Sequence, residues 1–168
     1  MIELKFPLNI TLDSPRPIFK AYINDTAMKC MLDTGADMPV FCKGEKLFKE
    51  LAKGMGEMSE FKKSLIGGFG KADENTILWH IDDFILSDRH SHIIYKGLKI
   101  AVLDKPNIPC DMILSASMFM KMKYTIDCSS KKHTLTIVAD KDTYGVGFYN
   151  KKETVYIFSE SGKESNYR

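Results

Sequence analysis

The sequence predicts a mostly β fold, closed or sandwich-like, with one or two short helices. Short apolar segments recur along the chain and are separated by turn residues, a pattern typical of β sandwiches and barrels. Only one segment has clear helical spacing. The 168 residues, 44% of them hydrophobic, are enough for a single globular domain with a core of its own.

The N-terminal part of the chain predicts a strand followed by a hairpin. Every even position of residues 2–12 is apolar, which indicates a half-buried strand. The apolar segments 18–23 and 27–32 flank Asn24-Asp25, two residues that tolerate positive φ and suit a tight turn. The second strand of this hairpin leads directly into Asp33.

The next part of the chain predicts one surface helix and a glycine-rich turn. Between residues 45 and 53, apolar side chains recur with helical spacing among charged ones. Gly54 and Gly56 are expected to end this helix. Residues 65–70 have little side-chain volume to pack in a core, so we expect them to form a mobile hairpin tip.

Short strands dominate the remainder. The segments expected as strands are 76–81, 84–86, 93–95, 98–103, 112–114, 124–126 and 134–138. A short helix is expected over residues 115–122. We divide the chain into a main domain, residues 1–138, and an extension, residues 139–168, which contains a second β-hairpin and a polar tail.

The charge and hydropathy patterns argue against two kinds of partner. The net charge is +2 and the charged residues are spread along the chain, so no concentrated positive field would attract nucleic acid. No apolar run is long enough to cross a bilayer, and the N-terminal segment lacks the apolar stretch of a secretory signal. We therefore expect a cytoplasmic protein that binds neither nucleic acid nor membrane.

The cysteines and histidines do not predict a disulfide scaffold or a metal site. The four cysteines are scattered and form no C-x-x-C pair, so we expect reduced, buried thiols. His90 and His92 would share one face of a strand, but no third ligand lies nearby in the sequence. We expect exposed loop histidines, and neither a metal nor another cofactor.

Asp33 is the strongest candidate for a catalytic residue. It follows an apolar strand and precedes Gly35, a residue that permits a sharp turn, so its carboxylate should be partly desolvated. Two carboxyl groups in contact cannot both ionise cheaply, and such a pair holds one proton between them. The pair supplies a base that activates water and an acid that protonates a leaving amine. Because Asp, Thr and Gly are also common in ordinary turns, the tripeptide with Thr34 does not by itself establish such a site.

A complete pair requires a second aspartate, and the chain offers only one suitable segment. Residues 142–145 are similar in composition, but a tyrosine ring interrupts them and no apolar strand precedes them. A two-fold axis would instead bring Asp33 against its own copy. Thr34 could then donate its hydroxyl across the axis and hold the two loops together. The sequence therefore predicts a homodimer.

Three segments resemble the retropepsin-like aspartic peptidases and occur in the order of that family. Residues 23–37 resemble the hairpin and the active-site loop. Residues 66–70, Ile-Gly-Gly-Phe-Gly, are similar to the glycine-rich flap that closes over the substrate. Residues 110–115, Cys-Asp-Met-Ile-Leu-Ser, are similar to the apolar segment that packs behind the catalytic loop. The resemblance spans residues 16–138.

The resemblance implies a homodimeric endopeptidase with a closed, β-barrel-like acid-protease fold, which needs no metal and binds extended polypeptide between its subunits. Asp33 would be the catalytic acid and base, and Thr34 and Gly35 would shape its loop. The residues implied to contact substrate are Ala36 and Asp37 in the loop, and Ile66, Gly67, Gly68, Phe69 and Gly70 in the flap. Those implied to support the loop from behind are Ile113, Leu114 and Ser115.

The chain departs from the family pattern in three places. Ser115 stands where the family usually has glycine. The insert 44–64 separates Asp33 from the flap segment. Retroviral members dimerise through their chain termini, whereas this chain continues from Asp140 into an extension that can change the interface. These departures leave a second hypothesis open: a catalytically inactive or latent module of this fold that dimerises or binds peptides.

Overall fold

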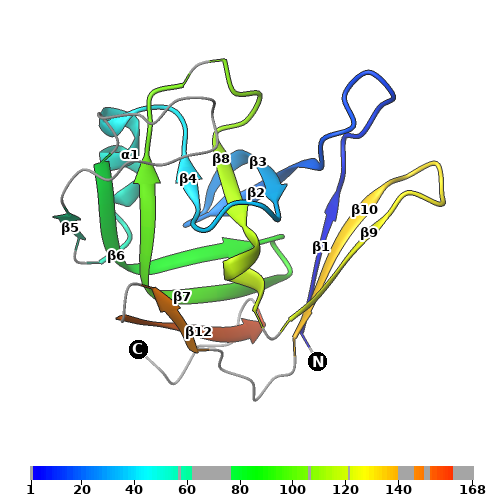
Figure 1. Ribbon diagram of the computed structural model, residues 1–168. Coiled ribbons are helices and arrows are strands. Elements are labelled where there is room, and N and C mark those ends of the chain that lie inside the picture. Colours follow the sequence, from blue (N-terminus) through cyan, green and yellow to red (C-terminus); the bar gives the residue numbers. More distant parts are fainter. Residues whose placement is uncertain are drawn as a thin grey trace.

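The chain folds into a mostly β structure, which confirms the predicted fold class. The computed structural model describes residues 2–56, 58–61, 77–105, 107–120, 122–139, 146–149 and 152–160. In these ranges the strands form one large and one small sheet, and one α-helix and one 3-10 helix accompany them (Figure 1). Within the described residues, no helix is both long and apolar enough to span a membrane.

The smaller sheet joins the N-terminal strand to a hairpin from much later in the chain. Its strands are β1 (Ile2–Pro7), β9 (Lys123–Asp127) and β10 (Thr134–Ala139). They pair in the antiparallel order β1-β10-β9. Leu4 and Phe6 of β1 lie opposite Ile137 and Leu135 of β10, and all four side chains are buried. The predicted alternation therefore holds within β1, but the strand ends at Pro7, and Leu12 at the end of the predicted strand is fully exposed.

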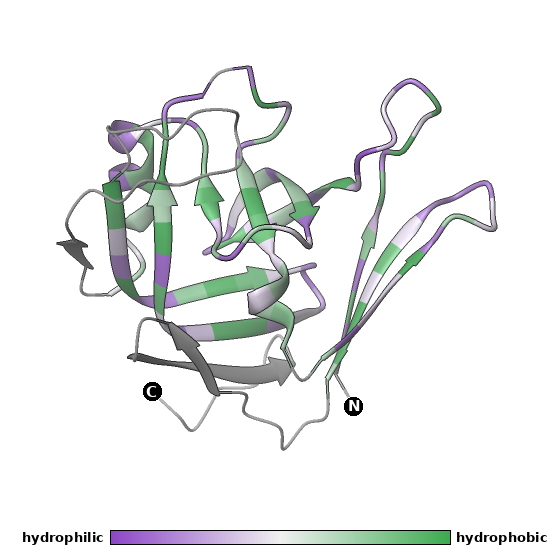
Figure 2. Ribbon diagram, in the orientation of Figure 1, coloured by the Kyte–Doolittle hydropathy of each residue, from purple (hydrophilic) through white to green (hydrophobic). Residues whose placement is uncertain are grey.

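The larger sheet contains the remaining strands. They are β2 (Ile18–Ile23), β3 (Thr26–Asp33), β4 (Val40–Phe41), β5 (Met58–Phe61), β6 (Ile77–Ser87), β7 (Ser91–Val102), β8 (Met112–Ser115), β11 (Val146–Tyr149) and β12 (Lys152–Glu160). Their order is β11-β12-β7-β4-β8-β3-β2-β6-β5, with an additional pairing between β6 and β7. The pairings thus run β7-β4-β8-β3-β2-β6 and return to β7. All six strands of this circuit contribute buried side chains to the main core, and Figure 2 shows hydrophobic residues along them.

The hairpin predicted before Asp33 forms as expected. Strands β2 and β3 pair from Ile18 opposite Met31 to Ile23 opposite Thr26. Asn24 and Asp25 make the turn with φ angles of 47° and 66°, the left-handed conformation that these residue types tolerate.

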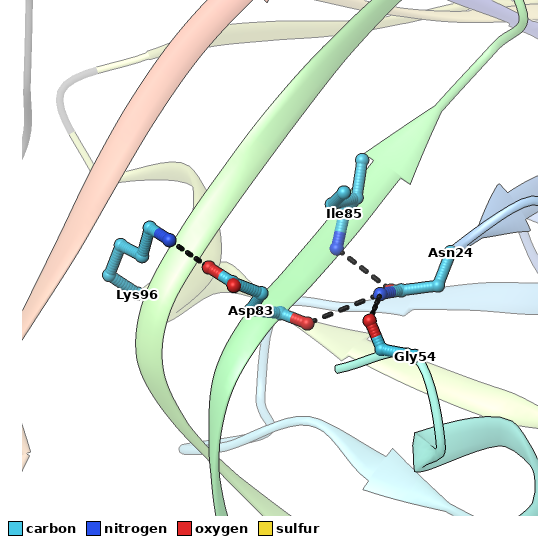
Figure 3. A network of polar contacts seen from close by, with 5 residues as sticks. All are labelled: Asn24, Gly54, Asp83, Ile85 and Lys96. Atoms are coloured by element: carbon cyan, nitrogen blue, oxygen red, sulfur yellow. Dashed lines mark hydrogen bonds and ion pairs between the residues drawn. The ribbon is translucent and has the colours of Figure 1, made fainter. Parts of the chain in front are cut away.

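The Asn24 side chain also fixes the hairpin to the rest of the domain (Figure 3). Its Oδ1 accepts a hydrogen bond from the Ile85 N–H at 3.0 Å, and its Nδ2 donates to the Asp83 carbonyl at 3.2 Å and the Gly54 carbonyl at 3.4 Å. Asp83 in turn forms an ion pair with Lys96 of β7. The hairpin is therefore attached both to β6 and to the segment after the helix.

The predicted surface helix is α1 (Glu45–Ala52), one residue shorter than expected. Its buried side is anchored by Phe48, whose ring lies 5.5 Å from that of Phe41 and 6.1 Å from that of Trp79. Gly56, after the helix, has a φ of 75°, a conformation for which glycine is suited.

Two pairs of predicted short strands are in fact two long strands. Of the segments 76–81 and 84–86, the described residues belong to β6, and 93–95 and 98–102 belong to β7. The ladder pairs Ile81 with Leu98 and resumes at Asp83 with Lys96, so it is interrupted where Asp82 faces Gly97, whose φ is 68°. Both strands bend sharply (Figure 1). The polar and glycine residues thus mark a bend within each strand and not its end.

The segment 115–122, predicted to be helical, contains the 3-10 helix η1 (Ala116–Phe119). In the C-terminal extension, β11 pairs with β12, and β12 pairs antiparallel with β7 from Val155 opposite Lys96 to Glu160 opposite Ser91. The extension therefore adds strands to the larger sheet.

Candidate active site

The loop after Asp33 passes over the end of another strand. β8 pairs parallel with β3 on one side and antiparallel with β4 on the other, so it lies between two strands that are consecutive in the chain. Asp33 is opposite Ser115, the last residue of β8, and Val40 is opposite Ile113. Residues 34–39 must therefore cross the end of β8. This crossing places the Asp33 carboxylate at the edge of a buried strand.

Asp33 sits at the boundary between core and surface. Cys30 and Leu32 before it are buried, Asp33 is half-buried, and Thr34 and Gly35 are exposed. The Gly35 N–H donates to Asp33 Oδ1 at 2.9 Å, and the Ala36 N–H donates to the Asp33 carbonyl at 3.2 Å. Among the described residues, Oδ2 has no hydrogen-bond partner. One carboxylate oxygen is therefore held by the loop while the other is left for a further ligand.

Gly35 provides space beside the carboxylate. A Cβ added at this position would lie 3.3 Å from Asp33 Oδ1, closer than most real Cβ contacts. Its φ does not lie in the left-handed region, unlike that of Gly44, Gly56 and Gly97. The chain turns at Thr34 and Gly35, but Gly35 does not adopt the left-handed conformation that favours glycine. Its role is to let the backbone N–H approach the carboxylate closely.

Ile113, Leu114 and Ser115, the residues implied to support the loop from behind, are fully buried. Ile113 packs in a small core with Val40 and Cys42, whereas Leu114 packs in the main core. Ser115 is also fully buried, and its hydroxyl lies 2.5 Å from the hydroxyl of Ser117 in η1. Serine is therefore accommodated where the family usually has glycine, because its polar atom has a partner within the same turn.

Asp111 holds the strands together at the other end of β8, a role that sequence reasoning missed. Its N–H donates to the Lys29 carbonyl at 2.8 Å and its Oδ2 accepts from the Lys29 N–H at 2.9 Å, which fixes β3. Its carbonyl accepts from the Cys42 N–H at 2.8 Å, just beyond β4. The signal in the sequence was an aspartate directly before an apolar strand. That pattern alone does not say which strands the residue will join.

Of the residues predicted to contact substrate, the structure describes those in the loop but not those in the flap. Ala36 is half-buried against the small core, and Asp37 is exposed on the same loop. Both therefore lie on the loop with Asp33. The flap residues Ile66, Gly67, Gly68, Phe69 and Gly70 lie outside the described residues, so their placement stays a prediction.

Cysteine and histidine side chains lie mostly as expected, with two exceptions. Cys30, Cys42 and Cys110 are buried, but Cys128 is exposed, so the expectation of buried thiols was wrong there. Burial raises the pKa of Cys30, and a hydrogen bond with Cys110 together with burial raises that of Cys42. These two thiols therefore stay protonated at neutral pH and provide no thiolate nucleophile behind the loop.

His90 is exposed in the turn before β7, as expected, but His92 is half-buried within β7. Burial lowers the pKa of His92, so the imidazole is more often neutral than an exposed one. In the described ranges, no three His, Cys, Asp or Glu side chains gather into a group that could hold a metal ion.

Comparison with known proteins gives likenesses only among solved structures. No family model matches the chain, and no curated protein matches it. A retropepsin-like aspartic protease from Rickettsia conorii is 16% identical, with a TM-score of 0.47 over 82% of this chain and 95% of that chain. EIAV protease, complexed with the inhibitor HBY-793, is 24% identical, with a TM-score of 0.46 over 67% of this chain and 92% of that chain. The chain is similar in fold to a retropepsin-like aspartic protease.

Proposed function

We propose that the chain is an aspartic endopeptidase that works as a homodimer, with Asp33 of each copy forming one catalytic pair. The main support for the proposal is the environment of the Asp33 carboxylate. It is half-buried at the end of β3, one oxygen is bound by Gly35, and the other has no partner among the described residues. Such a carboxylate is positioned to share a proton or to bind a water molecule.

The single chain supplies only half of the pair. In the described part of the chain, the one hydrogen bond to the Asp33 side chain comes from the Gly35 backbone, so no second carboxyl group is bonded to it. The Thr34 hydroxyl is exposed and, among the described residues, takes part in no hydrogen bond. Both features favour a site that a second copy completes through a two-fold axis at the loop.

In the proposed mechanism, two Asp33 carboxyl groups share one proton. The ionised carboxylate takes a proton from a water molecule as the water oxygen attacks the carbonyl carbon of the peptide bond. The protonated carboxyl group then gives its proton to the leaving nitrogen as the C–N bond breaks. No covalent intermediate with the enzyme forms. The substrate is proposed to be an extended polypeptide, as the resemblance of residues 23–37 implies.

Replacement of the carboxylate tests the proposal directly. Asp33→Asn keeps the shape of the side chain and removes its ability to accept a proton, so the cleavage rate of an unfolded polypeptide should fall by about a hundredfold or more. The matched control is Asp13→Asn, the same change at an exposed aspartate in the loop between β1 and β2. The control should cleave like the unmodified protein.

Two results would reject the enzyme. Cleavage that survives Asp33→Asn in a purified sample would show that another group carries the chemistry. A stable dimer that cleaves none of a broad set of unfolded polypeptides would favour the inactive, peptide-binding or dimerising module instead.

A further inference from the structure

Two cysteines lie beside each other in the small core behind the Asp33 loop. Cys42 directly follows β4, and Asp111 alone separates Cys110 from β8. Both pack in the small core with Val40, and neither is more than 1% exposed. The Cys42 thiol donates a hydrogen bond to the Cys110 sulfur, and its Sγ also lies 3.8 Å from the Val40 carbonyl oxygen, a second acceptor. All the cysteines are free, so this pair is in its dithiol form.

The backbone brings the two cysteines within reach of each other. Strands β4 and β8 lie side by side, with Phe41 opposite Met112 (Figure 1). Beyond them, the Cys42 N–H donates to the Asp111 carbonyl at 2.8 Å, so position 42 lies across from the residue next to Cys110. The chain bends at residues 108–111, and Cys110 therefore turns into the same small core as Cys42. A disulfide joins Cα atoms about 4.4–6.8 Å apart, a range that includes residues next to an opposite pair.

The cysteine pair lies just beneath the surface. Along the chain, Cys110 stands between Pro109, which is exposed, and Asp111, which is half-buried. The described residues directly before β8 belong to no strand. Segments of this kind open locally more easily than paired strands do. Hydrogen peroxide is small and uncharged, so a brief opening of residues 107–110 admits it to both thiols.

The two thiols differ in how readily they ionise. The hydrogen bond from Cys42 lowers the pKa of Cys110. Lys43 and Lys29 act in the same direction, whereas burial and Asp111 act against it. In Cys42 the same hydrogen bond, together with burial, raises the pKa. Cys110 is therefore the thiol that ionises first and attacks an oxidant, and Cys42 keeps its proton until a second step.

We propose that Cys42 and Cys110 form a dithiol–disulfide site, which a peroxide oxidises to a disulfide that joins the end of β4 to the segment before β8. The Cys110 thiolate attacks one oxygen of the peroxide, so that an S–O bond forms and the O–O bond breaks. The hydroxide that leaves takes up the proton that Cys110 released. The Cys42 sulfur then attacks the sulfenic sulfur of Cys110: an S–S bond forms, the S–O bond breaks, and the leaving hydroxide takes the Cys42 proton. Two thiols are thereby oxidised to one disulfide, and hydrogen peroxide is reduced to two water molecules.

The disulfide fixes the strands that carry the Asp33 loop without touching the carboxylate. Asp33 lies opposite Ser115 at one end of β8, whereas Cys110 precedes the other end. At that other end, Asp111 already bonds to β3 and to the Cys42 N–H. The disulfide adds a covalent link to this junction. The inference is independent of the proposed peptidase, because no step of the oxidation uses Asp33.

Oxidation of the folded protein tests the pair. A Cys128→Ser variant lacks the exposed thiol and keeps the three buried ones. After treatment with hydrogen peroxide, this variant should have lost two of its three thiols when titrated in denaturant, and dithiothreitol should restore them. Peptide mapping by mass spectrometry should find one cross-link, between Cys42 and Cys110. Retention of all three thiols, or conversion to sulfinic or sulfonic acids without a cross-link, would overturn the site.

Cys30 supplies the matched control, because it is also a fully buried cysteine but packs in the main core. In the Cys128→Ser background, Cys30→Ala should still form the cross-link, and Cys42→Ala should form none. If Cys42→Ala instead linked Cys30 to Cys110 at the same rate, the position of Cys42 would not decide the reaction, and the proposal would be wrong.

The same oxidation in denaturant shows whether the fold selects the pair. In an unfolded chain short loops close most readily, and Cys30 is nearer to Cys42 in the sequence than Cys110 is. The unfolded Cys128→Ser variant should therefore give mainly the link between Cys30 and Cys42, and the folded one mainly that between Cys42 and Cys110. The same set of links from both samples would contradict the proposal.

The link should also stabilise the native chain. It joins residues far apart in the sequence and so restricts the unfolded chain. The Tm of the oxidised Cys128→Ser variant, measured by circular dichroism without reductant, should exceed that of the reduced form by about 5 °C or more. Peroxide-treated Cys42→Ala should show no such rise. An oxidised Tm at or below the reduced one would mean that the native structure does not place the two thiols for a disulfide, and would overturn the site.

Discussion

Asp33 and Gly35 are linked at the end of β3 by a hydrogen bond from the glycine N–H to the carboxylate. Glycine has no side chain, so its N–H can approach the carboxylate closely. Gly35→Ala would place a Cβ 3.3 Å from Asp33 Oδ1, so the loop or the carboxylate must shift. If the proposed function holds, kcat should fall by about tenfold or more, since a catalytic group loses an orienting hydrogen bond. The free energy of unfolding should change by less than about 1 kcal/mol, because Gly35 is exposed. Steady-state kinetics and chemical denaturation measure the two effects.

The control for this variant is Gly54→Ala. No atom lies within 4 Å of a Cβ at position 54, and the φ of Gly54 is not left-handed, so the change should leave cleavage intact. Unchanged kcat in Gly35→Ala would mean that the hydrogen bond to Asp33 does not position the reacting group.

At the residue scale, the sequence predicts where Asp33 lies better than it predicts how its neighbours contact it. Asp33 lies at the end of an apolar strand as expected, since the pattern of buried and exposed residues is local. The function of Gly35 could not be derived, because a glycine needed for a positive φ and one needed for a close approach look the same in a sequence. Ser115 is similar: its fit depends on Ser117, whose position is set by η1.

At the scale of elements, the hairpin before Asp33 depends on Asn24 (Figure 3). Asn24→Gly keeps a residue that tolerates the φ of 47° but removes the hydrogen bonds to Ile85, Asp83 and Gly54. Each is worth about 1 kcal/mol, and the Ile85 N–H loses its acceptor, so the free energy of unfolding should fall by about 3 kcal/mol. Asn24→Ala should lose about 1 kcal/mol more because of the left-handed backbone.

The neighbouring turn residue supplies the control. Asp25 has a φ of 66° and is exposed, so Asp25→Gly relieves backbone strain without removing a side-chain hydrogen bond. Urea denaturation should find it within about 1 kcal/mol of the unmodified protein. If Asn24→Gly were as stable as Asp25→Gly, the side-chain bonds of Asn24 would have no net effect on stability.

Elements that depend on near neighbours were predicted correctly, and those that depend on distant ones were not. The β2–β3 hairpin and α1 follow from turn residues and helical spacing. By contrast, β6 and β7 continue through Asp82 and Gly97 because each strand supports the other across the bend. The parallel pairing of β3 with β8 joins segments far apart in sequence, and local patterns carry no information about such partners.

At the scale of the whole molecule, two places on the described surface carry polar groups without partners. The Asp33 carboxylate has an oxygen without a partner, and β9 has an edge without a strand, both judged within the described residues. The sequence predicted that Asp33 requires a second carboxyl group from another copy, because the chain contains one suitable aspartate segment. It did not predict the free edge of β9. Residues 124–126 have only the pattern of a strand, and their exposure depends on how β1 and β10 pack.

Mixing subunits distinguishes a shared site from one contained in a single chain. Suppose that one active site uses Asp33 from two copies and that the copies exchange freely. Asp33→Asn chain added to a fixed amount of the unmodified chain then draws the unmodified chain into inactive heterodimers. Activity should fall to about one half at equal amounts and to about one tenth at a ninefold excess, provided that all chains are dimeric. A site contained in one chain would lose no activity. The control is the same addition of Asp13→Asn chain, which keeps Asp33 and should therefore raise activity in proportion to the chain added. A loss of activity on adding Asp13→Asn chain would mean that the suppression does not come from Asp33.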